Sequence, residues 1–121
     1  MKVIQKFFPL LKKRQWAKAE KFLKLAVKKI DEDDWVKGYI HALNGMINAL
    51  KAPYSPPQPY IVKLKEFNSG KLQEAKDVFT ELSNTLNSKN EFDAAYFSAW
   101  EDFTHYSLRT KEEKTANLAD E

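Results

Sequence analysis

The chain contains no cysteine, and it has only three glycines and five prolines among its 121 residues. The absence of cysteine excludes disulfide bonds, thiolate metal sites and thiol nucleophiles. Four of the five prolines fall between positions 53 and 59, so proline hardly interrupts the rest of the chain. Because proline and glycine are the strongest helix breakers, their scarcity elsewhere leaves long stretches that are free to form helices.

Long apolar runs are also missing. No segment approaches the roughly 20 consecutive apolar residues that are needed to span a bilayer. The first residues do not resemble a signal peptide, because Lys6 and Pro9 break their apolar run and no small-residue cleavage site follows. A hydrophobic content of 43% is nevertheless enough to build one core. We therefore expect a single soluble, cytoplasmic domain that does not contact a membrane.

Apolar residues recur at spacings of three and four along most of the chain. This spacing places them on one face of an α-helix, and no alternating pattern typical of a β-strand competes with it. Asp33 and Asn90 precede two of these stretches and are expected to be helix N-caps. The sequence therefore predicts an all-α fold. The residues expected to be buried along successive helices are Trp16, Ala19, Phe22, Leu23, Ala26, Val27 and Ile30, then Trp35, Tyr39, Ala42, Leu43, Met46, Ile47 and Leu50, then Ile61, Leu64 and Phe67, then Leu72, Ala75, Val78, Phe79, Leu82 and Leu86, and finally Phe92, Ala95, Tyr96, Ala99, Phe103 and Tyr106.

The same order of elements occurs twice: a short helix, a long helix and a second long helix. Sliding the chain against itself by 56 or 57 residues brings the two copies together. We predict about six helices in two similar three-helix units, forming one domain over residues 1–108 with an internal repeat at 2–50 and 60–106 and a proline-rich connector at 52–60. The apolar pattern is lost beyond this domain, so residues 109–121 are expected to form a fraying tail. The positions that the repeat pairs include Ala19 with Ala75, Phe22 with Val78, Leu23 with Phe79, and Ala42 with Ala99.

Two stretches resemble the turn and second helix of a tetratricopeptide repeat. In that family a glycine, a large residue, an alanine and an aromatic residue mark this part of the repeat. The two stretches are Gly70-Lys-Leu-Gln-Glu-Ala-Lys-Asp-Val-Phe and Arg14-Gln-Trp-Ala-Lys-Ala-Glu-Lys-Phe. The resemblance covers about residues 2–30 and 60–87, which is roughly half of the chain.

The resemblance also has two departures from the family pattern. Arg14 stands where the family has glycine, and the period of about 57 residues differs from the family's 34. What the resemblance implies is antiparallel helix packing, with a small residue, Ala19 or Ala75, at the closest approach. The two units are expected to form either a compact bundle or a short superhelix similar to that of the family.

The net charge of +3 is unevenly distributed, since residues 1–30 carry ten Lys or Arg and a single acid, Glu20. Basic residues along one side of the first two helices are typical of electrostatic attachment to nucleic-acid phosphates. The competing interpretation is a solvated helix face, because arginine is the better bidentate phosphate ligand and the chain has only Arg14 and Arg109. The candidate nucleic-acid face consists of Lys12, Lys13, Arg14, Lys18, Lys21, Lys24, Lys28 and Lys29.

No motif for catalysis or cofactor binding is found. The acidic run at 31–34 lacks the alternating oxygen ligands and the glycine of a calcium loop, and its position suits the N-terminal end of a helix dipole. His41 and His105 have no second ligand at metal-binding spacing, and we expect them at the surface. The serines lie in no nucleophile elbow or phosphate loop. We therefore predict no catalytic, cofactor-binding or metal-binding residue, and no enzymatic activity.

Two apolar residues do not fit the buried stripes. Leu25 lies among the lysines, and Trp100 lies slightly off the stripe of Tyr96 and Phe103. Exposed apolar residues mark protein contacts, and aromatic anchors are enriched at interface centres. We therefore predict a non-enzymatic helical scaffold that mediates protein–protein interaction or self-association, with Leu25 and Trp100 as contact residues. The alternative is a nucleic-acid-associated protein that uses the basic N-terminal helical face.

Overall fold

The computed structural model describes residues 6–29, 33–52 and 59–119, except the side chains of Lys29 and of residues 114–119. Within these residues the chain forms six α-helices and no β-strand, so the predicted all-α fold is confirmed. The helices follow the predicted order of one short and two long elements, repeated once. None of the described helices is long and apolar enough to cross a membrane. The helices are α1 (Phe7–Lys12), α2 (Trp16–Lys29), α3 (Asp34–Lys51), α4 (Tyr60–Leu64), α5 (Ser69–Leu86) and α6 (Glu91–Ala119).

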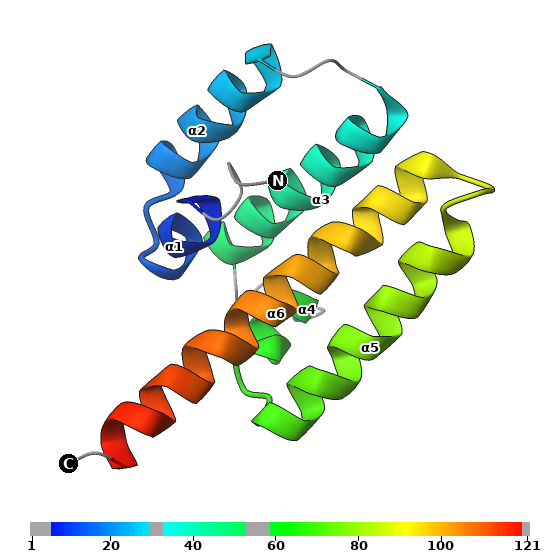
Figure 1. Cartoon of the computed structure of the whole chain (residues 1–121). Coiled ribbons are helices and arrows are strands. Elements are labelled where there is room, and N and C mark those ends of the chain that lie inside the picture. Colours follow the sequence, from blue (N-terminus) through cyan, green and yellow to red (C-terminus); the bar gives the residue numbers. More distant parts are fainter. Residues whose placement is uncertain (1–5, 30–32, 53–58, 120–121) are drawn as a thin grey trace.

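The four long helices lie side by side in the order α2, α3, α6, α5 (Figure 1). α2 runs antiparallel to α3, and α5 runs antiparallel to α6, so each half of the chain contributes one helical hairpin. The hairpins meet through α3 and α6, which run in the same direction. The contact between these two helices therefore holds the halves of the molecule together.

α3 and α6 approach each other closely at Gly38. A Cβ atom at this position would lie 2.0 Å from the carbonyl oxygen of Phe92 and 2.7 Å from its carbonyl carbon. Phe92 is in the first turn of α6, so the obstacle is helical backbone that cannot move aside locally. Only glycine fits here, because every other residue would place a carbon inside the backbone of α6.

Small side chains and one buried hydrogen bond complete the contact between α3 and α6. Ala42 on α3 and Ala95 and Ala99 on α6 are at most 1% exposed. The hydroxyl of Tyr39, which is fully buried, donates a hydrogen bond of 2.6 Å to Oδ2 of Asp102 on α6. This bond joins residues that are 63 positions apart, so it fixes how the two halves are aligned.

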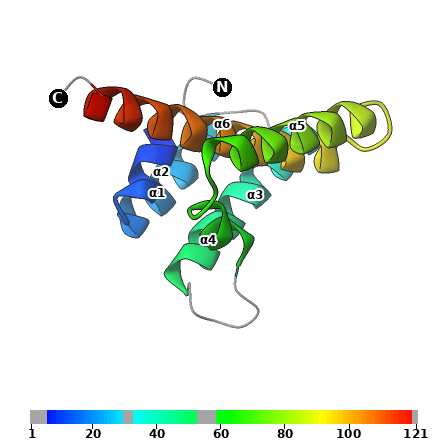
Figure 2. The ribbon, with the colours of Figure 1, turned by 90° about the horizontal axis from the view of Figure 1, so that it is seen from below.

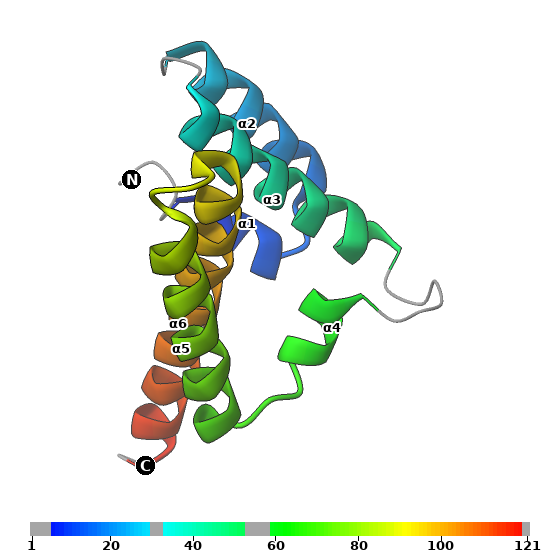
Figure 3. The ribbon, with the colours of Figure 1, turned by 90° about the vertical axis from the view of Figure 1, so that its right-hand side faces the viewer.

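The helices α3 and α6 diverge toward their C-terminal ends (Figures 2 and 3). The short helices α1 and α4 occupy the space that opens between them, which we call the wedge. Phe8 and Leu11 of α1 and Ile61 and Leu64 of α4 are buried there. The rings of Phe8 and Phe103 lie 5.5 Å apart in an edge contact, which joins α1 to α6. The wedge thus receives one short helix from each half of the chain.

The predicted N-caps are confirmed. Oδ1 of Asp33 accepts a hydrogen bond of 2.8 Å from the backbone N–H of Val36, at the start of α3. Oδ1 of Asn90 accepts one of 3.0 Å from the N–H of Asp93, at the start of α6. Each cap satisfies a donor that the helix leaves unpaired, so these polar residues define where the long helices begin.

The buried stripe is predicted correctly on α3 but only in part on α5. The predicted positions on α3 from Tyr39 to Leu50 are buried, whereas Leu72 is the one buried residue among the six predicted on α5. Val78 is 54% exposed and Leu82 is 36% exposed, so their predicted burial is wrong. The reason is the place of α5 at the end of the row, where a long helix covers it on one side only (Figure 1).

The last helix is longer than the sequence analysis expects. α6 continues to Ala119, although residues beyond Arg109 were expected to fray. No glycine or proline follows Arg109, so nothing in the sequence interrupts the helix. Within this expected tail, the amino group of Lys111 donates a hydrogen bond to the carbonyl oxygen of Phe67. This part of the expected tail is therefore packed against the body of the protein.

Some predicted features lie outside the described residues. They are Ile30, the acids Asp31 and Glu32, and positions 53–58 of the proline-rich connector. Tyr60, the last residue of the predicted connector, is the first residue of α4.

The close approach at Gly38 generates a test with a control on the same helix. We expect Gly38→Ala to lower the free energy of unfolding by about 2–4 kcal/mol, because α3 and α6 must move apart to admit the methyl group. A Cβ atom at Gly45 meets nothing within 4 Å, so Gly45→Ala is expected to raise it by about 0.5–1 kcal/mol. Urea unfolding followed by circular dichroism measures both. Equal effects of the two substitutions would contradict the packing described here.

The buried phenol of Tyr39 generates a second test. Burial, followed by the hydrogen bond to Asp102, raises the pKa of Tyr39 well above its ordinary value. Above about pH 10 the unfolded phenol ionises while the folded one stays neutral, so stability that is fully present below pH 10 is lost as the pH rises. We expect the free energy of unfolding to fall with a slope steeper by about 1.4 kcal/mol per pH unit than in Tyr39→Phe. Urea unfolding at several pH values between 9 and 11 compares the two slopes, and identical slopes would refute the assignment.

Candidate functional site

Five aromatic rings form a continuous cluster over α4, α5 and α6, which we call the aromatic face. Its members are Tyr60, Phe67, Phe79, Phe97 and Trp100. The Tyr60 ring lies 5.7 Å from Trp100 and 6.1 Å from Phe79, and Phe79 lies 5.9 Å from Trp100. Phe79 also stacks on Phe97 at 6.4 Å, and Tyr60 meets Phe67 at 6.3 Å. The rings therefore support one another as a single surface across three helices.

The aromatic face is bordered by exposed aliphatic side chains. Val78 and Leu82 follow one another on α5 at helical spacing, and Tyr60 itself is 43% exposed. Tyr60 and Val78 line a shallow depression of about 540 Å³, which also includes Lys71 and Glu74 among its lining residues. The apolar surface is thus continuous, with one positive and one negative side chain at its edge.

Positions that the predicted repeat pairs differ in burial between the two halves of the chain. Ala19 and Leu23 on α2 are buried, whereas their partners in the predicted repeat, Ala75 and Phe79 on α5, are only half-buried. Ala42 and Ala99, which the repeat also pairs, are both buried. At the positions of Ala19 and Leu23, α2 is covered more fully than α5, whereas Trp16 on α2 is half-buried and Leu72 on α5 is buried.

Trp100 and Leu25 do not share a surface. Trp100 is half-buried within the aromatic face and also touches the core through Phe103, at a ring distance of 6.3 Å. Leu25 is 49% exposed on α2, at the opposite end of the row of helices (Figure 1). The two predicted contact residues belong to separate candidate sites. The sequence analysis missed the neighbours of Trp100, because it assigned the whole apolar surface of α5 to the core.

The candidate nucleic-acid face is divided by the structure. Lys18, Lys21, Lys24 and Lys28 are exposed along α2, and none forms an ion pair with a residue that the structure describes. Lys12, Lys13 and Arg14 lie at the end of α1 and in the turn that follows. The side chain of Lys29 is outside the described residues. Lys18, Lys21, Lys24 and Lys28 therefore share one helix, with Leu25 among them.

Arg14, which stands where the resembled family has glycine, adopts an unusual backbone conformation. Its φ angle is 59°, in the left-handed region. The N–H of Arg14 donates to the carbonyl of Leu11, and the N–H of Gln15 donates to the carbonyl of Leu10, which is the Schellman arrangement at a helix end. Arginine therefore occupies a left-handed position at the end of α1 that glycine adopts more readily.

Comparisons with known proteins give no relative. No family model, curated protein or solved structure matches this chain. The tetratricopeptide-repeat resemblance stays a prediction.

The remaining sequence candidates are placed as follows. His41 and His105 are exposed on α3 and α6, respectively, and the ring of His41 lies 5.6 Å from that of Phe92. Asp33 acts as an N-cap. The described part of the chain holds no group of three or more potential metal-ligating side chains.

Proposed function

We propose that this protein is a non-enzymatic helical scaffold that mediates protein–protein interaction, and that it associates with a second copy of itself through the aromatic face. The observation that carries the proposal is the exposure of Val78 and Leu82 beside a continuous cluster of rings. Large exposed apolar patches are uncommon on monomeric proteins. Covering a valine or leucine side chain contributes about 1.5–3 kcal/mol when burial is complete, so shared burial of this surface favours association.

Two features support a second copy as the occupant. The edge of the aromatic face carries both signs of charge, from Lys71 and Glu74, so the surface is complementary to itself in a two-fold arrangement. Ala75 and Phe79 on α5 are also less covered than the equivalent positions on α2, Ala19 and Leu23, which are buried. A second molecule supplies the cover that α5 lacks. Trp100 contacts both Tyr60 and Phe79 in this cluster and is the expected anchor.

The proposal is tested by changing one exposed side chain. We expect Val78→Glu to weaken self-association by about tenfold or more, because dimerisation would bury a carboxylate without a partner. The side chain is 54% exposed, so the substitution is expected to leave the unfolding midpoint nearly unchanged. Size exclusion with light scattering over a range of protein concentrations, at low and high salt, measures the dissociation constant.

Leu25→Glu is the matched control, because Leu25 is 49% exposed and lies at the other end of the row of helices. A dimer that persists in Leu25→Glu and is lost in Val78→Glu supports the aromatic face. The reverse result would assign association to α2 instead. A wild-type chain that stays monomeric at every concentration would overturn self-association.

The second candidate function is nucleic-acid binding through α2. The observation that favours it is the line of exposed lysines Lys18, Lys21, Lys24 and Lys28 on one helix. Such a line follows a phosphate backbone without reading its sequence, and its binding weakens as salt rises.

Two double variants of equal net charge test the second candidate. We expect Lys21→Gln with Lys28→Gln to lower duplex DNA affinity by about tenfold or more and to reduce the slope of log affinity against log salt by about 1.8. Lys63→Gln with Lys89→Gln removes the same charge from exposed positions outside α2. Fluorescence anisotropy with a labelled duplex at several salt concentrations separates them. Equal losses in both variants would mean that only net charge matters.

A further inference from the structure

The wedge between α3 and α6 is not completely filled. It contains a cavity of about 410 Å³, which lies within the ~300–1,000 Å³ typical of small-molecule sites. All four of the surrounding helices α1, α3, α4 and α6, together with the first turns of α5, contribute to its wall. The apolar part of the wall consists of Phe8, Leu11, Leu50, Leu64, Phe67, Leu72 and Phe103.

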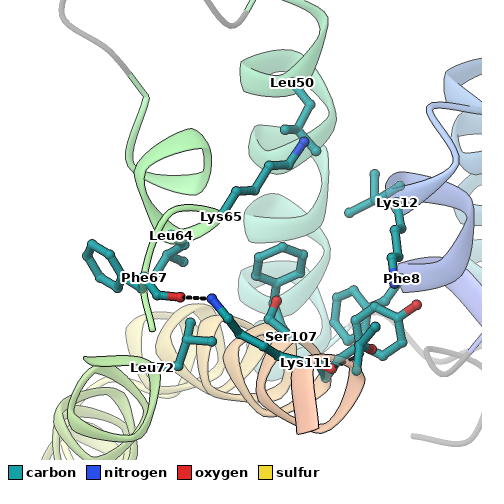
Figure 4. Close-up of a pocket in the computed structure, with 13 residues that line it drawn as sticks. Phe8, Lys12, Leu50, Leu64, Lys65, Phe67, Leu72, Ser107 and Lys111 are labelled. Atoms are coloured by element: carbon teal, nitrogen blue, oxygen red, sulfur yellow. Dashed lines mark hydrogen bonds between the residues drawn. The ribbon is translucent and has the colours of Figure 1, made fainter. Parts of the chain in front are cut away.

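The polar part of the wall is entirely basic or neutral. Lys12, Lys65 and Lys111 line the cavity, and none of the Asp or Glu residues that the structure describes does. Figure 4 shows Lys12 on α1 and Lys65, next to α4, on opposite sides of the cavity, with α3 behind them. The hydroxyl side chains Ser107 and Thr110 add neutral polar atoms from α6. An apolar chamber is therefore combined with positive charge and no compensating carboxylate.

Lys12 and Lys65 are the two lysines of the wall that are candidates for pairing with an anionic ligand. The amino group of Lys111 already donates a hydrogen bond to the Phe67 carbonyl at one side of the cavity (Figure 4). Burial, with a smaller contribution from the nearby Arg14, lowers the pKa of Lys65. The surroundings therefore oppose the positive charge of Lys65, and an anion beside it would relieve that cost.

We propose that the wedge cavity binds a small amphipathic anion, with an alkyl or aryl body among the apolar wall residues and one carboxylate or phosphate head between Lys12 and Lys65. The apolar wall selects against inorganic anions, which gain nothing from it. The lysines select against neutral apolar molecules, which leave the positive charge uncompensated. The site draws on both halves of the chain and shares Phe67 with the aromatic face, but it does not rest on the proposed self-association.

The test uses decanoate as the probe and isothermal titration calorimetry as the measurement, below the concentration at which the probe forms micelles. We expect one decanoate per chain and an affinity at least about tenfold higher than for decan-1-ol. Inorganic phosphate is expected to give no measurable heat. Decyl phosphate distinguishes the two head groups: binding of either acid supports the site, and failure of both overturns it.

Variants locate the binding. Lys65→Gln and Lys12→Gln are each expected to weaken decanoate binding by about fivefold or more, while Lys63→Gln and Lys13→Gln leave it unchanged, since these exposed neighbours do not line the cavity. Ser107→Leu is expected to reduce binding by occupying the cavity without altering any charge. Circular dichroism verifies that each variant is folded. The proposal would be overturned if substitutions at Lys12, Lys65 and Ser107 all left the affinity for decanoate unchanged. It would also be overturned if the wild-type chain bound decanoate and decan-1-ol with equal affinity.

Discussion

The close approach of α3 to α6 at Gly38 is the constraint on which the rest of the structure depends. Because a Cβ atom there would lie 2.0 Å from the Phe92 carbonyl oxygen, the two central helices touch backbone to backbone. Ala42, Ala95 and Ala99 keep the neighbouring surface low enough for that contact. Where the small residues end, larger side chains separate the helices, and the wedge opens. The position of the cavity therefore follows from where the chain places its small residues.

Local and periodic features of the fold were predictable from the sequence. Each of the N-caps at Asp33 and Asn90 depends only on one side chain and the helix that follows it, so the local sequence pattern was sufficient to predict both caps. The burial of α3 was predictable for a different reason, since this helix has neighbours on both sides. The contact at Gly38 was not predicted, because a glycine inside an apolar helix looks the same whether another backbone approaches it or not. The length of α6 was underestimated, because apolar periodicity says nothing about a helix that continues over polar residues such as Lys111.

For the candidate sites, too, local features were predictable from the sequence and features that depend on distant helices were not. Trp100 was identified because it lies off its own helical stripe, which is a local property. Val78 and Leu82 were not, because their exposure depends on the absence of a helix beyond α5, and an apolar residue at stripe spacing gives no sign of that. The basic residues were predicted as one surface from their proximity in the sequence. The turn at Arg14 separates them, leaving Lys12 at the wedge and Lys21 on α2.

α3 contacts α6 closely at Gly38 and separates from it toward its C-terminal end, so a small rotation about Gly38 displaces that end. From there to Leu50 the helix extends about 18 Å, at about 1.5 Å per residue. An outward displacement of about 1 Å at Leu50 therefore corresponds to a tilt of the α3 axis of only about 3° about Gly38. Because α2 packs on α3, such a tilt would carry the lysines of α2 with it. The packing of α1 and α4 in the wedge therefore sets the angle between α3 and α6, and with it the orientation of α2 (Figure 3).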